Sequence, residues 1–230
     1  MGSILLSGCN RGIGLELARC FACQSWRVFA TCRSPATADE LQALAAEHPL
    51  LTIHPLDVTD TGQIERLASE LKSLPIDILF NNAGIFGPEN QGIAETDVEG
   101  WLTTLRVNTI APLQMVERFV ENVSRSRLKI IASMGSAMGS LSENSSGGFY
   151  AYRTSKAGLH MVMRGLAADL APRDIISVAF HPGWVQTRMG GPQAPVTPQQ
   201  SASGLQRVLL GLTLNDSGKL LDYEGNERTW

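Results

Sequence analysis

The chain has 230 residues and a net charge of −3, and hydrophobic and charged residues make up 43% and 18% of it. This length suits one α/β domain with a sizeable core, so we predict a single domain over residues 1–230. The slight negative charge gives no reason to expect a nucleic acid or an anionic membrane as a partner. Since no apolar run approaches the ~18 residues that a membrane span needs and no basic segment precedes the first apolar one, we expect a cytoplasmic protein.

Short apolar segments alternate with segments of helical periodicity along the chain. The first unit is a strand at 3–7, a glycine-rich turn at 8–14, a helix through Phe21 and a strand at 28–31, which together make a βαβ unit. The same pattern predicts strands at 51–54, 76–80, 128–132, 175–180 and near Leu220, and helices at 38–47, 63–71, 96–123, 151–170 and 198–212. Strands of this continuous apolar kind favour a parallel sheet that is covered by helices on both faces. We therefore predict a doubly wound α/β fold, in which ligands bind at the carboxyl ends of the strands.

The glycine-rich turn has the spacing Gly-x-x-x-Gly-x-Gly and lies between a strand and a helix. Without side chains, its backbone amides can approach a pyrophosphate, and the helix N-terminus adds a favourable potential. A glycine-rich turn without a ligand is the alternative, which the position between strand and helix disfavours. The predicted cofactor-binding residues of the turn are Gly8, Asn10, Arg11, Gly12, Ile13 and Gly14.

The end of the second strand indicates which dinucleotide binds. An acidic residue there would accept a hydrogen bond from the ribose 2′-hydroxyl of NAD, but this strand ends in Thr31-Cys32-Arg33. Arg33 and Arg11 can instead hold a 2′-phosphate through paired hydrogen bonds, although single arginines are common on any protein surface. As a pair they favour NADP(H) over NAD(H).

Polar residues follow two further strands at the same edge of the sheet. Asp57-Val58 comes after the third predicted strand, and Asn81-Asn82-Ala83-Gly84 comes after the fourth. Both segments border the expected cofactor crevice, although Asn-Asn-Ala-Gly also suits a tight turn. Two long loops rich in Gly, Ser and Pro, at 135–148 and 183–198, follow later strands, and loops of this length are usually functional or mobile.

Tyr152 and Lys156 are four residues apart in a predicted helix, so they share a face one turn apart. An adjacent ammonium favours the ionised form of a phenol and lowers its pKa from about 10. A tyrosine tuned in this way can give or take a proton, as carbonyl reduction requires. A Tyr-x-x-x-Lys pair alone is common by chance, and it gains meaning from the dinucleotide site. Tyr150 is the weaker choice because Thr154, four residues later, supplies no cation.

The cysteines and histidines give no metal site. Cys20 and Cys23 have the spacing of a redox pair but lie late in a predicted helix, whereas reactive thiolates are favoured at a helix N-terminus. The histidines are scattered singly, with His54 and His181 each before a proline. We therefore predict packing roles for the cysteines and no bound metal.

Taken together, these motifs resemble those of the short-chain dehydrogenase/reductase family in order and approximate spacing. The matching motifs are the glycine turn, Asp57, Asn81-Asn82-Ala83-Gly84, Asn108, Ser133, Tyr152-x-x-x-Lys156 and Pro182-Gly183, and they span nearly the whole chain. The resemblance implies one Rossmann-like domain with a seven-stranded parallel sheet and helices on both faces. The segments at 141–148 and 181–191 further resemble the C-factor and sniffer-like carbonyl reductase branch.

The resemblance also implies the roles of individual residues. Tyr152 would be the proton donor and acceptor, and Lys156 would lower its pKa and bind the nicotinamide ribose. Ser133 would orient the carbonyl, with Ser136 as the alternative, and Asn108 would hold a water in a proton relay. The cofactor-binding residues beyond the glycine turn would be Arg33, Asp57, Val58, Asn82, Ala83, Gly84, Tyr152, Lys156, Pro182, Gly183, Val185 and Thr187.

These assignments predict an NADPH-dependent oxidoreductase that reduces a ketone or aldehyde to an alcohol and runs in reverse as a dehydrogenase. The alternative is a dinucleotide-binding signalling or sensor protein of the C-factor type without turnover, since fold does not fix function. Sugar-nucleotide epimerisation on a related fold is a third hypothesis, which the short segment after Phe180 disfavours. The predicted partner is a small carbonyl or alcohol molecule, and a homodimer or homotetramer remains open.

Overall fold

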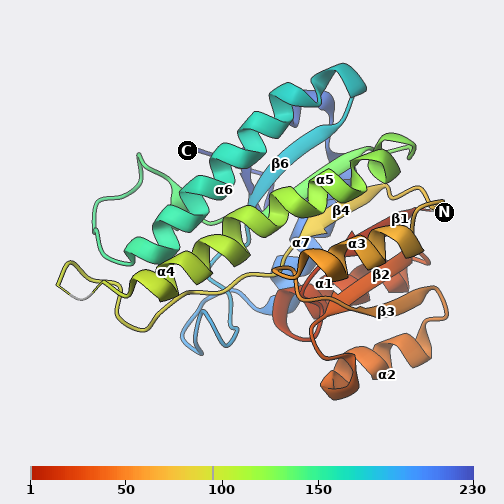
Figure 1. The fold of residues 1–230 in the computed structure, drawn as a ribbon, viewed down its shortest axis with the longest axis horizontal. Coiled ribbons are helices and arrows are strands. Elements are labelled where there is room, and N and C mark those ends of the chain that lie inside the picture. Colours follow the sequence, from red (N-terminus) through yellow and green to blue (C-terminus); the bar gives the residue numbers. More distant parts are fainter. Residues whose placement is uncertain (1, 95) are drawn as a thin grey trace.

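A computed structural model describes residues 2–94 and 96–230, and positions 1 and 95 of the predicted domain lie outside the described residues. The described strands form one sheet in the order β3-β2-β1-β4-β5-β6-β7-β8 (Figure 1). They are β1 (Ser3–Leu6), β2 (Arg27–Cys32), β3 (Leu51–Pro55), β4 (Ile78–Asn81), β5 (Ile130–Met134), β6 (Ile176–His181), β7 (Leu220–Asp222) and β8 (Glu227–Arg228). Neighbouring strands are parallel except β7 and β8, which are antiparallel.

Helices connect the strands and cover both faces of the sheet. They are α1 (Gly12–Cys23), α2 (Asp39–Glu47), α3 (Thr61–Glu70), α4 (Val98–Leu105), α5 (Ala111–Ser124), α6 (Tyr150–Asp169) and α7 (Pro198–Gly211). Buried side chains of α1, α2 and α7 pack in one core, and those of α3, α5 and α6 pack in the other. Figure 1 shows α3, α5 and α6 crossing the front of the sheet. The predicted doubly wound, Rossmann-like α/β fold is confirmed.

The two cores explain why the strands are apolar throughout. Successive side chains of a strand point to opposite faces of the sheet. In β1, Ile4 and Leu6 belong to the core with α1 and α7, whereas Leu5 belongs to the core with α5 and α6. All three are fully buried, and burial of such a side chain stabilises the fold by roughly 1.5–3 kcal/mol. Each strand therefore holds both helical layers in place.

Two features differ from the sequence predictions. The seven parallel strands are joined by an eighth, β8, which turns back along β7 after Gly225 with its positive φ of 99°. The long helix predicted at 96–123 is divided by a π-helical turn (Arg106–Ile110) between α4 and α5. Pro112 follows this turn and has no N–H to give to the carbonyl of Asn108, four residues earlier. Turns of this type often mark functional sites.

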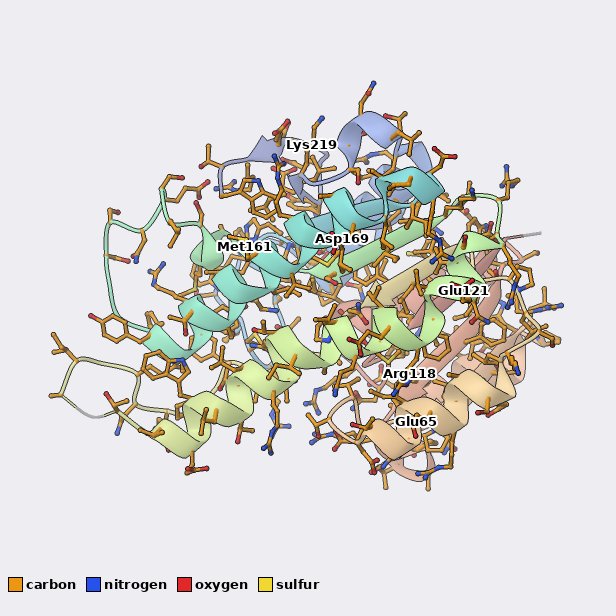
Figure 2. The ribbon with its side chains drawn as sticks, turned by 45° about the horizontal axis from the view of Figure 1, so that its top comes forward. Glu65, Arg118, Glu121, Met161, Asp169 and Lys219 are labelled. Atoms are coloured by element: carbon orange, nitrogen blue, oxygen red, sulfur yellow. The ribbon has the colours of Figure 1, made fainter. Side chains whose placement is uncertain are left out.

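Surface charge contributes little to the packing of these layers. Figure 2 shows Glu65 of α3 and Arg118 of α5 facing each other, and their Oε1 and Nη2 atoms are 2.9 Å apart. About half of each side chain is exposed, so this ion pair contributes at most about 1 kcal/mol. The apolar strand faces, rather than such pairs, fix the helices that carry the candidate site.

Candidate active site

The crevice of the sheet lies between β1 and β4, because the chain continues from these neighbouring strands in opposite directions across the sheet. The predicted glycine turn leaves β1 at this point. Gly8 and Gly12 have positive φ values of 73° and 56°, a conformation that residues with side chains disfavour. A Cβ atom on Gly14 would collide with the carbonyl of Gly8. The geometry of the turn therefore requires glycine at all three positions.

Asn82 joins the end of β4 to this turn by hydrogen bonds. Its Nδ2 atom donates to the carbonyls of Ser7 and Gly8 at 2.9 and 3.1 Å. The Ser7 hydroxyl in turn accepts from the backbone N–H groups of Asn82 and Ala83, both at 3.0 Å. Asn82 and Ala83 thus shape the turn through contacts within the protein, and their contact with a cofactor stays a prediction.

The N-terminus of α1 opens directly onto the turn. In the described structure, the residue before this helix, Arg11, makes no side-chain capping hydrogen bond. The first backbone N–H groups of a helix have no partner within it, and they attract an anion such as a pyrophosphate. Uncapped N–H groups from Gly12 onward, beside glycines that admit close approach, fit the predicted dinucleotide.

Arg11 and Arg33, which are predicted to select the dinucleotide, follow β1 and β2, and the predicted cofactor residues Asp57 and Val58 follow β3. Arg11 and Arg33 are both exposed, so either guanidinium is available to a phosphate. Asp57 accepts hydrogen bonds from the N–H and the hydroxyl of Thr59 at 2.9 and 2.7 Å, and Val58 beside it is half-buried. Since an arginine rather than an acidic residue follows β2, the arrangement fits a 2′-phosphate better than a 2′-hydroxyl.

The loop at 183–198 folds over the glycine turn. The Thr187 Cγ2 atom lies 3.4 Å from where a Cβ on Gly12 would be. Val185 is 4% exposed and forms a short bridge with Val196, which closes the loop on itself. Four predicted cofactor residues lie on the segment that leaves β6 towards the turn, and these are Pro182, Gly183, Val185 and Thr187.

Tyr152 and Lys156 lie on the buried face of α6, where they are 7% and 4% exposed. The Lys156 Nζ atom is 5.7 Å from the centre of the Tyr152 ring. It donates a hydrogen bond to the carbonyl of Met134 at 2.7 Å, so the end of β5 holds the ammonium beside the phenol. Tyr150, in contrast, is exposed at the start of the helix.

Burial shifts the pKa values of both groups. It raises the pKa of Tyr152 above its ordinary value, and hydrogen bonding by the Ser136 hydroxyl offsets part of the rise. Burial lowers the pKa of Lys156 to about 8. The predicted lowering of the Tyr152 pKa is therefore wrong in direction, because removing the phenolate from water outweighs the effect of its neighbours. At neutral pH the phenol is protonated and the lysine is mainly cationic.

Asn108 lies in the π-helical turn between α4 and α5 and is 1% exposed. Its Oδ1 accepts from the N–H of Ile85 at 2.9 Å, while its Nδ2 donates to the Ile85 carbonyl and the Ser155 hydroxyl at 2.8 and 2.9 Å. A Cβ atom on Gly84 would lie 3.3 Å from Asn108 Oδ1 and 3.6 Å from Lys156 Nζ. Asn108 therefore joins the segment after β4 to α6, close to the lysine.

The structure separates the two serine candidates. Ser133 lies within β5, is fully buried, and accepts a hydrogen bond from Asn81 Nδ2 at 3.3 Å. Ser136 follows the strand, and its hydroxyl is the hydrogen-bonding partner of the Tyr152 phenol. The geometry thus favours the alternative, Ser136, over the predicted Ser133, because strand pairing keeps Ser133 inside the sheet.

Two histidines that the sequence analysis left without a role hold the loop that carries Ser136. The N–H of Ser136 donates to His160 Nε2, and the N–H of Ala137 donates to His181 Nδ1, both at 3.3 Å. Burial lowers the pKa of each histidine to about 4, so the neutral rings can accept these bonds at neutral pH. His160 lies four residues after Lys156 on α6, and this spacing is the sequence signal that could have found it.

Within residues 2–94 and 96–230, no group of three or more His, Cys, Asp or Glu side chains is placed to hold a metal ion. Cys9 and Cys32 are buried, and burial raises the pKa of both thiols, which suits packing rather than reactivity. Among the described helices, none is long and apolar enough to cross a membrane.

Known oxidoreductases and a protein named C-signal are similar to this chain. The short chain dehydrogenase family model matches residues 3–196. The C-signal protein of Myxococcus xanthus is 40% identical over 156 residues, which are 68% of this chain and 93% of that protein. The solved carbonyl reductase Sniffer of D. melanogaster is 32% identical, covers both chains fully and has a TM-score of 0.93. An NADPH-bound carbonyl reductase from chicken fatty liver is 36% identical over 99% of this chain and 98% of that one, also with a TM-score of 0.93.

Proposed function

The chain belongs to the short-chain dehydrogenase family, and on that premise we propose that it reduces a ketone or aldehyde to an alcohol with NADPH and catalyses the reverse oxidation. One observation carries the proposal: at the carboxyl end of β5, the Tyr152 phenol and the Lys156 ammonium of α6 lie beside the Ser136 hydroxyl of the loop that follows the strand. The similar carbonyl reductases, one of them NADPH-bound, support the same reaction and cofactor.

Tyr152 gives the proton to the carbonyl oxygen during reduction. Its raised pKa keeps the proton on the phenol at neutral pH, so the donor form is the populated one. The Lys156 ammonium, 5.7 Å from the ring centre, stabilises the phenolate that remains. Ser136, beside the phenol, donates a hydrogen bond to the carbonyl oxygen of the substrate and orients it. NADPH, when bound, supplies the hydride to the carbonyl carbon.

The backbone at Asn108 offers a route for the proton that replaces the one given away. Pro112 leaves the Asn108 carbonyl without an α-helical partner, and the side chain of Asn108 lies close to Lys156. A carbonyl without its α-helical partner can hold a water, which would pass a proton to Lys156 and then to Tyr152. We thus keep the predicted relay role of Asn108 but assign it to the carbonyl, since its side-chain amide is bonded within the protein.

The residues proposed to hold NADPH surround the crevice on the turn after β1, the ends of β2, β3 and β4, the start of α6 and the loop after β6. Arg33, assisted by Arg11, would bind the 2′-phosphate. The full set is Gly8, Asn10, Arg11, Gly12, Ile13, Gly14, Arg33, Asp57, Val58, Asn82, Ala83, Gly84, Tyr152, Lys156, Pro182, Gly183, Val185 and Thr187.

The test is a panel of aldehydes and ketones, offered to the purified protein with saturating NADPH while the NADPH absorbance is followed. We expect turnover of at least one compound by the wild type and its loss in Tyr152→Phe. Absence of turnover across the panel, with NADPH bound, would refute the proposed reaction.

The similarity to the C-signal protein supports a second candidate, a dinucleotide-binding signalling protein without turnover. Binding alone, however, does not require a buried tyrosine that hydrogen-bonds with a serine beside a buried lysine. The enzyme is therefore favoured. Tight NADPH binding without oxidation by any compound of the panel would reverse that order.

A further inference from the structure

The helix that carries Tyr152 has an unusual start. The residue before α6, Phe149, has a left-handed backbone with φ 51° and ψ 40°, and in the described structure its side chain makes no capping hydrogen bond. The first N–H groups of a helix need partners from outside it, and a polar side chain just before the helix normally supplies one. At α6 a residue far away in sequence takes this place.

That residue is Gln91, in the segment between β4 and α4. Its Oε1 accepts a hydrogen bond from the backbone N–H of Tyr152 at 2.8 Å, and its carbonyl accepts from the N–H of Tyr150 at 3.2 Å. Its Nε2 donates to the carbonyls of Phe86 and Pro88, both at 2.9 Å. Figure 1 shows this segment, in yellow, extending to the end of the molecule where α6 begins.

The side chain of Gln91 is held in one orientation. It is 7% exposed, and both ends of its amide are bonded within the protein. Rotating the amide by half a turn would point Nε2 at the N–H of Tyr152 and Oε1 at two carbonyls, which would lose all three bonds. Since a buried unpaired polar group costs roughly 1–3 kcal/mol, the amide oxygen stays on the N–H of Tyr152.

The same segment contacts the Tyr152 ring. The centre of the Phe86 ring is 4.8 Å from that of Tyr152 and 5.4 Å from that of Phe149. Phe86 in turn is fixed to Gln91 through its carbonyl. Backbone and ring of the proposed proton donor are therefore both held by residues 86–91.

We propose that Gln91 is a positioning residue, which fixes the Tyr152 phenol relative to Ser136 and Lys156 through the first turn of α6. This inference rests on the proposed function, because Tyr152 must be the proton donor for its position to set the rate. A displacement of about 1 Å at a reacting group can lower a rate by about 10²-fold. Loss of Gln91 would therefore lower kcat more than it weakens cofactor binding.

Gln91→Leu removes the amide and keeps most of the volume. With 4-nitrobenzaldehyde and NADPH we expect kcat to fall by about 10- to 100-fold, while the Kd for NADPH and the Tm change little. Gln206→Leu is the matched control, since Gln206 is an equally buried glutamine (7% exposed) on α7. It should leave kcat unchanged.

Gln91→Glu adds a readout that a loss of stability alone would not give. One carboxylate oxygen can still accept from Tyr152, but the other faces the carbonyls of Phe86 and Pro88. When ionised it is repelled by them, and when protonated it donates to one of them, so its pKa rises above the ordinary value of about 4.3. Its kcat relative to wild type should therefore recover as the pH falls, at a temperature where both proteins remain folded.

Three outcomes overturn the inference: a wild-type kcat in Gln91→Leu, an equal loss of kcat in Gln206→Leu, or a ratio of Gln91→Glu to wild-type kcat that does not change with pH. If the wild type reduces no carbonyl compound, the proposed function is refuted, and so is the effect of Gln91 on the rate. Hydrogen exchange of residues 149–156 still distinguishes the cases. Faster exchange confined to that segment in Gln91→Leu shows that Gln91 holds the helix start, and unchanged exchange refutes the contact itself.

Discussion

The pair Ser136→Ala and Ser133→Ala tests which serine acts on the carbonyl. Ser136 carries the hydroxyl that hydrogen-bonds with Tyr152, so Ser136→Ala removes the group proposed to donate to the carbonyl oxygen. Removing one such donor from a site of this kind lowers kcat by roughly 10²–10³-fold. The same change removes the acceptor of the Met138 N–H, which is 3.2 Å from the Ser136 hydroxyl, at a cost of about 1 kcal/mol in stability.

Ser133→Ala is a matched control because its structural cost is similar. Its hydroxyl accepts one bond from Asn81 Nδ2, and that amide keeps a second partner in the Pro112 carbonyl at 3.4 Å. The net loss of one hydrogen bond is about 0.5–1.5 kcal/mol. For a chain of this size, 1 kcal/mol lowers Tm by about 2–4 °C. The Tm of both variants should therefore be a few degrees below that of the wild type, and Ser136→Ala should also lose turnover.

The assay is kcat for a turned-over aldehyde with saturating NADPH, beside thermal unfolding of each variant. A loss of turnover in Ser133→Ala with a wild-type rate in Ser136→Ala would refute the geometric argument and restore the assignment from the sequence. Equal losses in both variants would mean that β5 and the loop act as one unit, and would also contradict the separation described above.

Three further outcomes are expected. Tyr152→Phe removes only the transferable proton, so kcat should fall by at least roughly 10²-fold with NADPH binding retained; a near wild-type kcat would contradict proton donation by this residue. Arg33→Ala should lower kcat/KM for NADPH by one to two decades, since a charge-assisted bond contributes about 1.5–3 kcal/mol, and should spare NADH; equal efficiency of the wild type with both cofactors is the contrary result. Burial lowers the pKa of His160 and His181 from 6.5 to about 4, so as the pH falls these histidines are protonated in the unfolded chain before they are in the folded one. The stability that they contribute above pH 6.5 is therefore lost as the pH falls towards 4, by up to roughly 3 kcal/mol per ring. Urea unfolding near pH 7 and near pH 5 should show a weaker pH dependence in His160→Asn than in the wild type, and equal dependence would contradict it.

The sequence was sufficient to predict the fold because its signals are local and repeated. Each strand is a short apolar run, each is followed by a helix, and that alternation admits few arrangements other than a doubly wound sheet. The glycine turn was predictable for the same reason. Gly8 and Gly14 meet across a few residues of chain, so their spacing alone encodes the contact.

The position of the serine was not predictable because it depends on where a strand ends. β5 continues through Met134, which keeps Ser133 inside the sheet and brings the following loop, with Ser136, to the phenol. The direction of the Tyr152 pKa shift was missed for a related reason. The spacing to Lys156 shows a favourable charge, whereas the opposing effect of burial depends on how closely the rest of the chain covers the ring.

Burial also decides which groups near Tyr152 carry charge. Tyr152, Lys156 and His160 follow one another at four-residue spacing on α6, and burial disfavours the ionised form of all three. Lysine is a stronger base than histidine, so at neutral pH Lys156 keeps its proton while His160 does not. Its charge further lowers the pKa of His160, and the neutral ring accepts the N–H of Ser136. The cation that would stabilise the phenolate of Tyr152 therefore also keeps His160 in the state that holds the serine in place.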